Sequence, residues 1–279
     1  MIATVAECVA QQKRLAAISD SPRLDCELLL AEVLGKSRSW LFAYPEKALE
    51  PEQLCAFESL FERRLNGEPI AHILGRREFW GLTLAVNAST LIPRPDTETL
   101  VEAALELSLA SNAAVLDLGT GTGAIALALA HERPTWQLVG ADFSEEAVAL
   151  AEHNAQLTGL TGVSFHHSNW YAAFAGQRFD LIVSNPPYID KKDQHLNEGD
   201  VRFEPLSALV AEQQGLADLA YIISQAPSYL ESAGFLMLEH GYDQGAAVRK
   251  LLEQHGFVAA KTIQDLGGND RVSFVQLGK

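Results

Sequence analysis

Asn185-Pro186-Pro187-Tyr188 is the stretch of the sequence that best indicates a particular chemistry. Each proline fixes φ at about −65°, and Pro187 also restricts Pro186 to extended geometry, so the Pro186 carbonyl points in one direction. The side-chain oxygen of Asn185 is a second hydrogen-bond acceptor. Two acceptors match the two N–H bonds of a primary amide or an aromatic amino group. The turn therefore predicts a reaction at a planar nitrogen, with Tyr188 as a wall beside its plane.

A glycine-rich loop, Asp117-Leu118-Gly119-Thr120-Gly121-Thr122-Gly123, precedes this turn along the chain. It follows an apolar stretch, and its glycines allow a tight turn and a close approach of a ligand to backbone amides. No Gly-Lys-Ser/Thr follows, so the loop is not a Walker A loop. Asp142 lies 19 residues after Gly123, where a carboxylate can accept hydrogen bonds from ribose hydroxyls. Loop and carboxylate fit both NAD and S-adenosylmethionine.

Asp142 could instead cap a helix that starts close by, at Ser144 or Glu145. Ser144 fills the capping role better, because a serine directly before a helix is among the preferred N-cap residues. We therefore favour a ligand contact for Asp142.

The elements that must position these residues alternate between short β-rich runs and helical segments from residue 113 onward. Such alternation is typical of an α/β fold with a mostly parallel sheet. The predicted strands are 114–118, 137–142, 163–167, 179–184, 234–239, 258–264 and 271–277, and the predicted helices are 124–131, 145–157, 216–229 and 244–255. The longest irregular segment, 189–214, directly follows the Asn-Pro-Pro-Tyr turn, and long loops are often functional.

The first part of the chain is predicted to be helical. One helix starts near Pro22 and ends at Gly35, and a second covers residues 51–65. After residue 78 the apolar pattern changes to the alternation of a strand. We expect a helical N-terminal substrate-docking domain over residues 1–76, a β-hairpin linker over 77–90 and an α/β domain over 91–279.

The formal net charge of −15 lies almost wholly in the second part of the chain. Residues 1–85 hold 10 Lys and Arg against 12 Asp and Glu, which leaves 11 against 24 for residues 86–279. An acidic body repels a phosphate backbone, so a protein or small-molecule substrate is favoured and no direct nucleic-acid binding is expected. Apolar stretches fall short of the roughly 20 residues that span a bilayer, and the first residues do not resemble a secretory signal. We expect a cytoplasmic protein without a membrane partner.

The three cysteines, Cys8, Cys26 and Cys55, lack metal-ligand spacing, and the eight histidines form no HExxH motif. We expect reduced cysteines and no metal site.

The Asn-Pro-Pro-Tyr turn after the fourth predicted strand, with the glycine loop after the first, resembles the class I S-adenosylmethionine-dependent methyltransferases that act on planar nitrogens. These modify adenine amino groups or glutamine side-chain amides. Within this class, the segment Leu-Ile-Pro-Arg-Pro-Asp-Thr-Glu at residues 91–98 and the helical N-terminal part closely resemble the release factor glutamine methyltransferase family, also called PrmC or HemK. The resemblance covers essentially the full chain.

This resemblance implies a Rossmann-like fold with a seven-stranded, mostly parallel sheet and a small helical N-terminal domain. It also implies S-adenosylmethionine as methyl donor. The implied substrate is the side-chain nitrogen (N5) of the glutamine in the Gly-Gly-Gln motif of class 1 peptide chain release factors.

The resemblance assigns roles to individual residues. The implied catalytic residues are Asn185, Pro186 and Tyr188. The implied cofactor-binding residues are Asp117, Gly119, Thr120, Gly121, Thr122, Gly123, Asp142, Asn169, Trp170 and Asn185. The implied substrate-binding residues are Asn185, Pro186, Pro187, Tyr188 and Arg94.

Several of these roles have alternatives. Asn169 stands where related sequences commonly carry aspartate, although an asparagine can still accept a hydrogen bond from an adenine amino group. Trp170 fits core packing as well as a place beside adenine. Arg94 fits a substrate contact or a linker position equally. The segment Phe203-Glu204-Pro205 resembles a family segment near the substrate entrance, and a solvated loop is the alternative.

Other substrates fit parts of the pattern. A glutamine methyltransferase acting on a ribosomal protein would share the turn, but residues 93–95 favour the release factor branch. An adenine methyltransferase is disfavoured by the acidic body and by the lack of an evident basic target-recognition domain. An NAD-dependent oxidoreductase would leave the turn without a role. The pairs Arg63-Arg64 and Arg76-Arg77 suggest a protein-docking surface, with solvated helix ends as the alternative.

Overall fold

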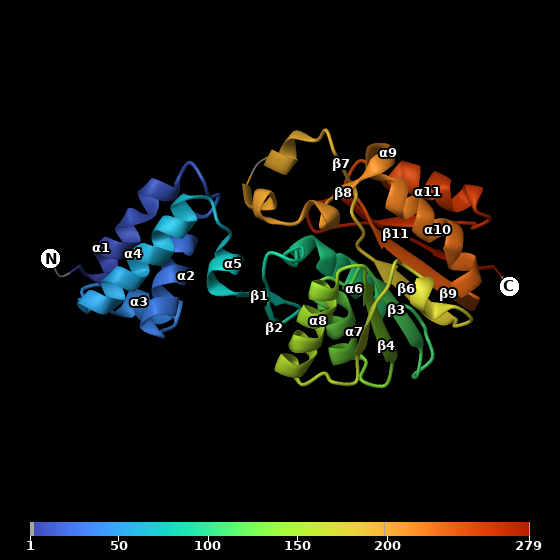
Figure 1. Ribbon diagram of the computed structural model, residues 1–279, viewed down its shortest axis with the longest axis horizontal. Helices are drawn as coiled ribbons and strands as arrows, with labels where there is room; N and C mark the ends of the chain where they lie inside the picture. The colour runs from blue at the N-terminus through green and yellow to red at the C-terminus, as the bar shows by residue number, and fades with distance from the viewer. Residues whose placement is uncertain (1–2, 198, 279) are drawn as a thin grey trace. The chain divides into compact units, whose positions relative to one another are not determined.

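Residues 3–197 and 199–278 are described by the computed structural model, and they pack as two units (Figure 1). The first unit contains Met1–Arg76 together with Gln194–Phe203, and the second contains Arg77–Asp193 and Glu204–Lys279. Residues 1, 2, 198 and 279, which belong to the expected domains, lie outside the described residues. In the part of the chain that is described, every helix is too short or too polar to cross a membrane.

The first unit consists of short helices around an apolar core of its own. They are α1 (Val5–Ala10), the 3₁₀ helix η1 (Gln11–Leu15), α2 (Pro22–Leu34), α3 (Arg38–Ala43), α4 (Pro51–Leu65) and α5 (Ile70–Leu74). Helix α2 starts with Pro22 in its first turn and ends at Gly35, whose φ of 62° is the left-handed conformation common after a helix. The fully buried side chains of Leu29, Leu30 and Phe57 join α2 to α4.

The segment Gln194–Phe203 also belongs to the first unit, whereas the expected bounds grouped it with residues 91–279. It contains the 3₁₀ helices η4 (Gln194–Asn197) and η5 (Gly199–Phe203). Asp200 accepts a hydrogen bond of 3.2 Å from the buried Arg64 of α4. Arg64 and Asp200 are 136 positions apart, and such a pair leaves no local pattern in the sequence. The sequence therefore did not reveal that this segment belongs with the helical unit.

A two-stranded sheet, β1 (Arg76–Phe79) and β2 (Leu82–Ala85), starts the second unit. Trp80 and Gly81 form the turn with left-handed φ values of 51° and 71°, which breaks the alternating apolar run into two strands. Phe79 and Leu84 are buried in the core of the second unit. The hairpin is therefore packed against the α/β core.

A seven-stranded sheet forms the centre of the second unit, in the order β10-β11-β9-β6-β3-β4-β5. The strands in this order are β10 (Lys261–Gln264), β11 (Asp270–Gln276), β9 (Leu230–Glu239), β6 (Phe179–Ser184), β3 (Ala114–Leu118), β4 (Gln137–Asp142) and β5 (Ser164–His167). Neighbours from β9 to β5 are parallel, and β11 is antiparallel to both β9 and β10. The predicted fold class is confirmed.

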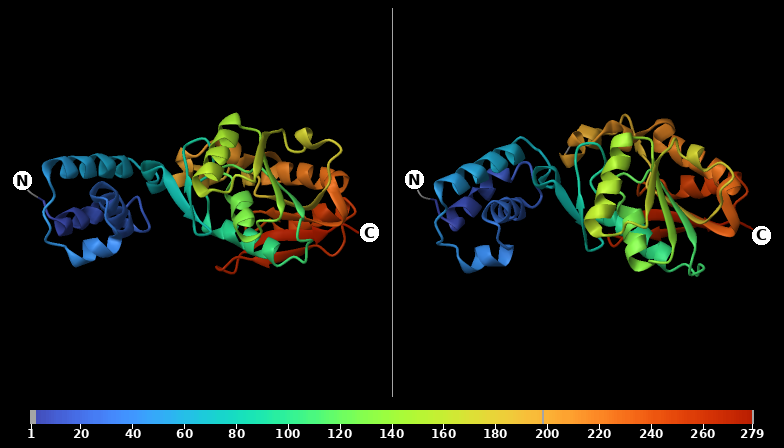
Figure 2. Two further views of the ribbon diagram at one scale, coloured as in Figure 1. Left: turned by 90° about the horizontal axis from the view of Figure 1, so that it is seen from below. Right: turned by 60° about the horizontal axis from the view of Figure 1, so that its bottom comes forward.

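Helices cover both faces of this sheet, as Figures 1 and 2 show. On one face lie α6 (Glu98–Leu105), α7 (Ala124–Glu132) and α8 (Glu145–Thr158), and on the other α10 (Ala217–Tyr229) and α11 (Gly245–Gln254). Successive residues of a strand point to opposite faces, so Val115 packs under the first group and Leu116 under the second. Both are fully buried, as expected for a strand covered on both sides.

Short elements complete the second unit. They are η2 (Pro95–Thr97), η3 (Ala172–Phe174), β7 (Ile189–Asp190), η6 (Leu206–Ala208), β8 (Val210–Ala211) and α9 (Glu212–Gly215). Strands β7 and β8 pair in parallel within the segment that had been expected to be irregular.

Two predicted strands, at 163–167 and 271–277, differ from the observed β5 and β11 by one residue at one or both ends, and two others differ by more. Strand β9 starts at Leu230 rather than at residue 234, because Leu230 is buried and pairs with Phe179. Strand β10 starts at Lys261 rather than at residue 258, because Val258 is exposed and Ala259 has a left-handed φ of 58°.

The strand order reverses between β3 and β6, because the chain runs outward through β4 and β5 and then returns beside β3. The loops that follow β3 and β6 consequently leave the same edge of the sheet in diverging directions. In open α/β sheets, ligands bind at such a point. The glycine loop and the Asn-Pro-Pro-Tyr turn occupy these two positions.

Gly140 in β4 supports the glycine loop through the space that it leaves. A Cβ atom there would lie 2.5 Å from Cδ1 of Phe165 and 2.7 Å from Oγ1 of Thr120. Because neither neighbour can be overlapped, Gly140→Ala is expected to lower the free energy of unfolding by about 1–3 kcal/mol. Urea denaturation measures this change. Gly162→Ala is the matched control, since a Cβ at Gly162 meets nothing within 4 Å, and equal stability of the two variants would contradict the prediction.

Candidate active site

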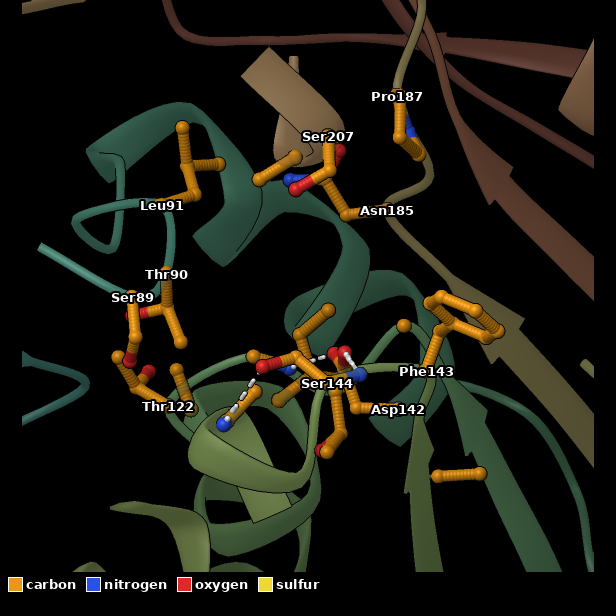
Figure 3. Close-up of a pocket in the computed structure, with 18 of the residues that line it drawn as sticks. Ser89, Thr90, Leu91, Thr122, Asp142, Phe143, Ser144, Asn185, Pro187 and Ser207 are labelled. Atoms are coloured by element: carbon orange, nitrogen blue, oxygen red, sulfur yellow. Dashed lines mark hydrogen bonds between the residues drawn. The ribbon is translucent and has the colours of Figure 1, made fainter. Parts of the chain in front are cut away.

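A cavity of about 390 Å³ lies at the carboxyl ends of β3, β4 and β6, entirely within the second unit. In Figure 3, Asp142, Phe143 and Ser144 lie toward the bottom of the view, and Leu91, Asn185 and Ser207 lie toward the top. Predicted site residues that line the cavity are Arg94, Gly119, Thr120, Gly121, Thr122, Asp142, Asn169, Trp170, Asn185 and Pro187. Asp117, Gly123, Pro186 and Tyr188 are not among the residues that line it.

The glycine loop has the backbone conformation for which its glycines are needed. Gly119, Gly121 and Gly123 have left-handed φ values of 69°, 54° and 81°. The N–H of Thr120 donates to the carbonyl of Ala141 at 2.9 Å, which ties the loop to the end of β4. A side chain at these three positions would strain the turn, so the loop exposes backbone to the cavity.

Asp117 is fully buried beneath the loop and does not line the cavity. Its Oδ2 accepts a hydrogen bond of 2.6 Å from the Thr120 hydroxyl. Burial raises the pKa of Asp117 from its usual value of 3.8 to about 7, while the Thr120 hydrogen bond opposes the rise. Asp117 therefore shapes the loop from below.

Asp142 joins two of the loops that form the cavity. Its Oδ2 accepts from the N–H of Gly121 and its Oδ1 from the N–H of Ser144, each at 2.9 Å (Figure 3). Ser144 is the N-cap of α8, because its hydroxyl accepts from the N–H of Ala147 at 3.2 Å. Burial raises the pKa of Asp142. The carboxylate thus lines the cavity with one hydrogen bond already made at each oxygen.

Trp170 is half-buried and has an unusual left-handed φ of 50°. The Ser168 hydroxyl holds this bend by donating to the Trp170 carbonyl at 2.7 Å. The indole packs on the apolar core below α10 and lies beside the glycine loop, where a Cβ on Gly119 would be 3.6 Å from it. Trp170 is therefore both a packed residue and part of the cavity wall, and its neighbour Asn169 is exposed at the rim.

Phe143 is a cavity residue that sequence reasoning missed. Its side chain is 71% exposed, and its ring lies 6.0 Å from that of His167. The Phe143 carbonyl also lies 2.8 Å from Nε2 of His167. The sequence did offer one indication of this role, because Phe143 is an aromatic residue directly after Asp142, the aspartate that ends β4. Thr90 and Ser207, which also line the cavity, belong to no recognisable motif.

The Asn-Pro-Pro-Tyr turn is attached to the sheet and to η2. The Ser184 hydroxyl donates to the Leu118 carbonyl at 2.7 Å, which joins the ends of β6 and β3. Nδ2 of Asn185 donates to Oγ1 of Thr97 at 3.2 Å. The turn thus presents Asn185 and Pro187 to the cavity, with Pro186 buried.

Tyr188, predicted as a catalytic and substrate-binding residue, does not line the cavity. Its hydroxyl lies 3.4 Å from Oε1 of Glu239, and burial raises its pKa. Its carbonyl accepts from Nε2 of Gln244 at 3.0 Å. A Cβ on Gly215 would come within 2.0 Å of the same carbonyl oxygen, so a glycine is required where α9 packs on the turn.

Arg94 lines the cavity and is also held by an ion pair. Its guanidinium donates to Oε2 of Glu204 at 2.5 Å, and Oε1 of Glu204 accepts from the N–H of Ile92 at 2.7 Å. The Glu204 side chain is 0% exposed, so this residue does not fit the alternative of a solvated loop. Arg94 was predicted either to contact substrate or to be a linker residue. It lines the cavity, as a substrate contact would, and it also makes a structural ion pair.

The sheet order, the glycine loop with Asp142, and the Asn-Pro-Pro-Tyr turn together define a class I S-adenosylmethionine-dependent methyltransferase. Family models match two parts of the chain: a PrmC N-terminal domain over residues 10–75 and a methyltransferase small domain over residues 95–201. The chain belongs to the release factor glutamine methyltransferase family.

Relatives of high similarity support this membership. A release factor glutamine methyltransferase from Pseudomonas aeruginosa is 57% identical over 258 residues, which cover 92% of this chain and 94% of the relative. One from Aliivibrio fischeri is 52% identical over 259 residues, which cover 92% and 91%. A methyltransferase structure from Pyrococcus furiosus is similar in fold, with a TM-score of 0.56 at 16% identity over 80% of this chain and all of that one. The predicted family is confirmed.

The cavity fits the methyl donor that this class uses. Ligand pockets commonly measure about 300–1,000 Å³ and combine an apolar lining with a few polar groups. Here the backbone of the glycine loop, the Asp142 carboxylate and the Phe143 ring meet in one cavity of about 390 Å³. Within residues 3–197 and 199–278, no group of three or more His, Cys, Asp or Glu could hold a metal ion.

The raised pKa of Asp117 predicts a pH dependence of stability. Because folding raises this pKa from 3.8 to about 7, the folded protein binds more protons between these values, and the contribution of Asp117 to the free energy of unfolding falls as the pH rises from about 4 to about 7. Asp117→Asn should remove that fall. Urea denaturation across this pH range measures the difference between wild type and variant.

The exposed Asp20 offers the control for this measurement. Asp20→Asn should follow the pH profile of the wild type. An Asp117→Asn profile parallel to that of the wild type would show that Asp117 does not carry a raised pKa.

Proposed function

We propose that this protein transfers a methyl group from S-adenosylmethionine to the side-chain amide nitrogen (N5) of the glutamine in the Gly-Gly-Gln motif of class 1 peptide chain release factors. The family to which the chain belongs supports this substrate. The observation that carries the proposal is the arrangement of Asn185. Its Nδ2 is bonded to Thr97, so its Oδ1 remains an acceptor beside the cavity that holds the glycine loop.

We propose the following contacts for the methyl donor. Backbone groups of Gly119–Gly123 bind its methionine part, and the Asp142 carboxylate accepts hydrogen bonds from its ribose. Phe143 and Trp170 contact the adenine ring, and Asn169 accepts from the adenine amino group at the rim. The free lone pairs on the Asp142 oxygens and the 71% exposure of the Phe143 ring support these assignments.

Bound S-adenosylmethionine supplies an electrophilic methyl group. An amide nitrogen is a poor nucleophile, because its lone pair is shared with the carbonyl. In our proposal Asn185 Oδ1 and the Pro186 carbonyl accept the two amide hydrogens and orient the nitrogen. Both hydrogen bonds strengthen as positive charge develops on nitrogen, which is the differential stabilisation that catalysis requires. The product proton is acidic enough to leave to water without a dedicated base.

The other site residues predicted from the sequence take supporting roles in the proposal. Pro187 forms part of the substrate wall and Arg94 shapes the cavity mouth through its ion pair with Glu204. Tyr188 supports the turn from behind, because its hydroxyl is directed to Glu239. We propose residues 1–76 as the docking domain for the release factor. Because release factors act on ribosomes, the proposal also implies a cytoplasmic enzyme.

The substrate is tested with labelled S-adenosylmethionine and four acceptors: a release factor, the same factor with its Gly-Gly-Gln glutamine replaced, a ribosomal protein fraction and DNA. Label should appear on the intact release factor alone. Label on the substituted factor, or only on ribosomal protein or DNA, would overturn the proposed substrate.

Asn185→Ala should lower kcat for the release factor by about 10²–10³, the range for loss of one preorganised hydrogen-bonding group in an active site. The affinity for S-adenosylmethionine should change by less than about threefold, since the glycine loop and Asp142 are unchanged. Steady-state kinetics and calorimetry measure the two quantities. Asn112→Ala, an exposed position before β3, is the control. Wild-type turnover by Asn185→Ala would rule out the two-acceptor arrangement.

Asp142→Ala should weaken binding of S-adenosylmethionine by at least about tenfold. The change removes the proposed ribose acceptor and leaves the N–H groups of Gly121 and Ser144 without their acceptor. Titration calorimetry measures the affinity. Asp180→Ala is the matched control, because it also removes a carboxylate that accepts from a backbone N–H, that of Ala114 at the start of β3. It should leave the affinity for S-adenosylmethionine unchanged. Equal affinities for both variants would contradict the role of Asp142.

A further inference from the structure

The side-chain amide of Asn185 has two ends of similar shape and opposite polarity. Oδ1 can accept a hydrogen bond from a substrate N–H, whereas Nδ2 in the same place would repel it. The proposed function therefore needs the amide held in one of two orientations. In the structure the 3.2 Å hydrogen bond from Nδ2 to Thr97 Oγ1 corresponds to the productive one.

Thr97 lies between Asn185 and a buried acid. It is 4% exposed at the end of η2, and hydrogen bonding by its hydroxyl lowers the pKa of Glu239, against the rise caused by burial. Glu239 is 1% exposed at the end of β9, with Tyr188 Oη 3.4 Å from Oε1. Oε2 has no partner at hydrogen-bond distance among the described residues. A carboxylate so deeply buried, with so few partners, lowers the stability of the folded protein. Its presence at this position therefore points to a purpose other than stability.

We propose that Thr97, oriented by Glu239, is a positioning residue that fixes the side-chain amide of Asn185 so that Oδ1 faces the substrate nitrogen. This inference rests on the proposed function, because it concerns the acceptor that Asn185 supplies there. Neither Thr97 nor Glu239 needs to touch the reacting atoms.

The polarity of the groups explains how the orientation is set. An ionised carboxylate can only accept hydrogen bonds, so the single proton of the Thr97 hydroxyl is directed to Glu239. The lone pairs of Thr97 Oγ1 then remain for Asn185, which must offer Nδ2. A neutral Glu239 could donate to Thr97 instead. The Thr97 hydroxyl proton would then be free to bond Asn185 Oδ1, and the Asn185 side-chain amide could flip to its other orientation.

Charged groups on the neighbouring elements decide the state of Glu239. Burial raises the pKa of Glu239 to about 7, Arg271 of β11 lowers it, and Asp96 of η2 raises it. Arg271 is shared, because it forms ion pairs with Asp96 at 3.2 Å and with Asp265 at 2.9 Å. The Tyr188 hydroxyl, 3.4 Å from Oε1, is a further titratable group that faces Glu239.

Thr97→Val and Thr97→Ser test the proposal. Valine keeps the shape and removes the hydroxyl, so kcat for the release factor should fall by about 10²-fold, as expected when a reacting group is misplaced. The KM for release factor and the affinity for S-adenosylmethionine should change by less than about threefold. Serine keeps the hydroxyl and should restore kcat to within about threefold of the wild type. Thermal unfolding verifies that each variant is folded.

Thr158→Val is the matched control. The Thr158 hydroxyl also serves a hydrogen bond, to the carbonyl of Asn154 in α8, and Thr158 does not line the cavity. This variant should keep wild-type kcat. Equal activity of Thr97→Val and Thr158→Val, or a Thr97→Ser variant as slow as Thr97→Val, would overturn the role of the Thr97 hydroxyl.

Glu239→Gln tests the part of Glu239, the second partner of Thr97, through the dependence of kcat on pH. The wild-type kcat should rise with pH through about 7 as Glu239 ionises, and the variant should lose this limb and be slower at pH 8. A limb that persists in Glu239→Gln belongs to another group, such as Asp117, and overturns the part assigned to Glu239. Failure of the wild type to methylate the release factor would instead reject the proposed function, so the two failures are distinguishable.

Discussion

Leu118 and Ser184 are paired at the carboxyl ends of two neighbouring parallel strands, and the Ser184 hydroxyl donates to the Leu118 carbonyl oxygen at 2.7 Å. This bond sets the distance between the loop that approaches a cofactor and the turn that receives a substrate. Loops alone could not maintain it, because backbone outside a sheet is mobile. The central position of both strands, covered by helices on each face, makes the spacing rigid.

Three acidic side chains under or beside the cavity, Asp117, Asp142 and Glu239, share a raised pKa caused by burial. Each costs stability in its charged form, and each is connected to a group that faces the cavity: Thr120, the backbone of Gly121, and Thr97. The site thus depends on buried acceptors that dictate where neighbouring donors point. Such an arrangement trades stability for orientation, as is common where a protein must bind or react.

Sequence reasoning succeeded where the information is local. Strands β3, β4 and β6 were predicted with their observed bounds, because each is a mostly apolar run in a sheet covered on both faces. The glycine loop and the Asn-Pro-Pro-Tyr turn were recognisable from their spacing. Thr97 and Glu239 were not, because their roles arise from partners 88 and 51 positions away along the chain, and no local pattern records such pairs.

The chain passes between the two units three times, after Arg76, after Asp193 and after Phe203. The stretch recognised as an N-terminal domain, residues 10–75, is therefore an incomplete structural unit, since Asp200, the partner of its buried Arg64, is encoded more than a hundred residues later. A gene fusion that exchanged only the first part would leave that arginine without this carboxylate. Inheritance of the helical unit is thus tied to a segment that lies within the methyltransferase part of the sequence, and the two segments are expected to change together during evolution.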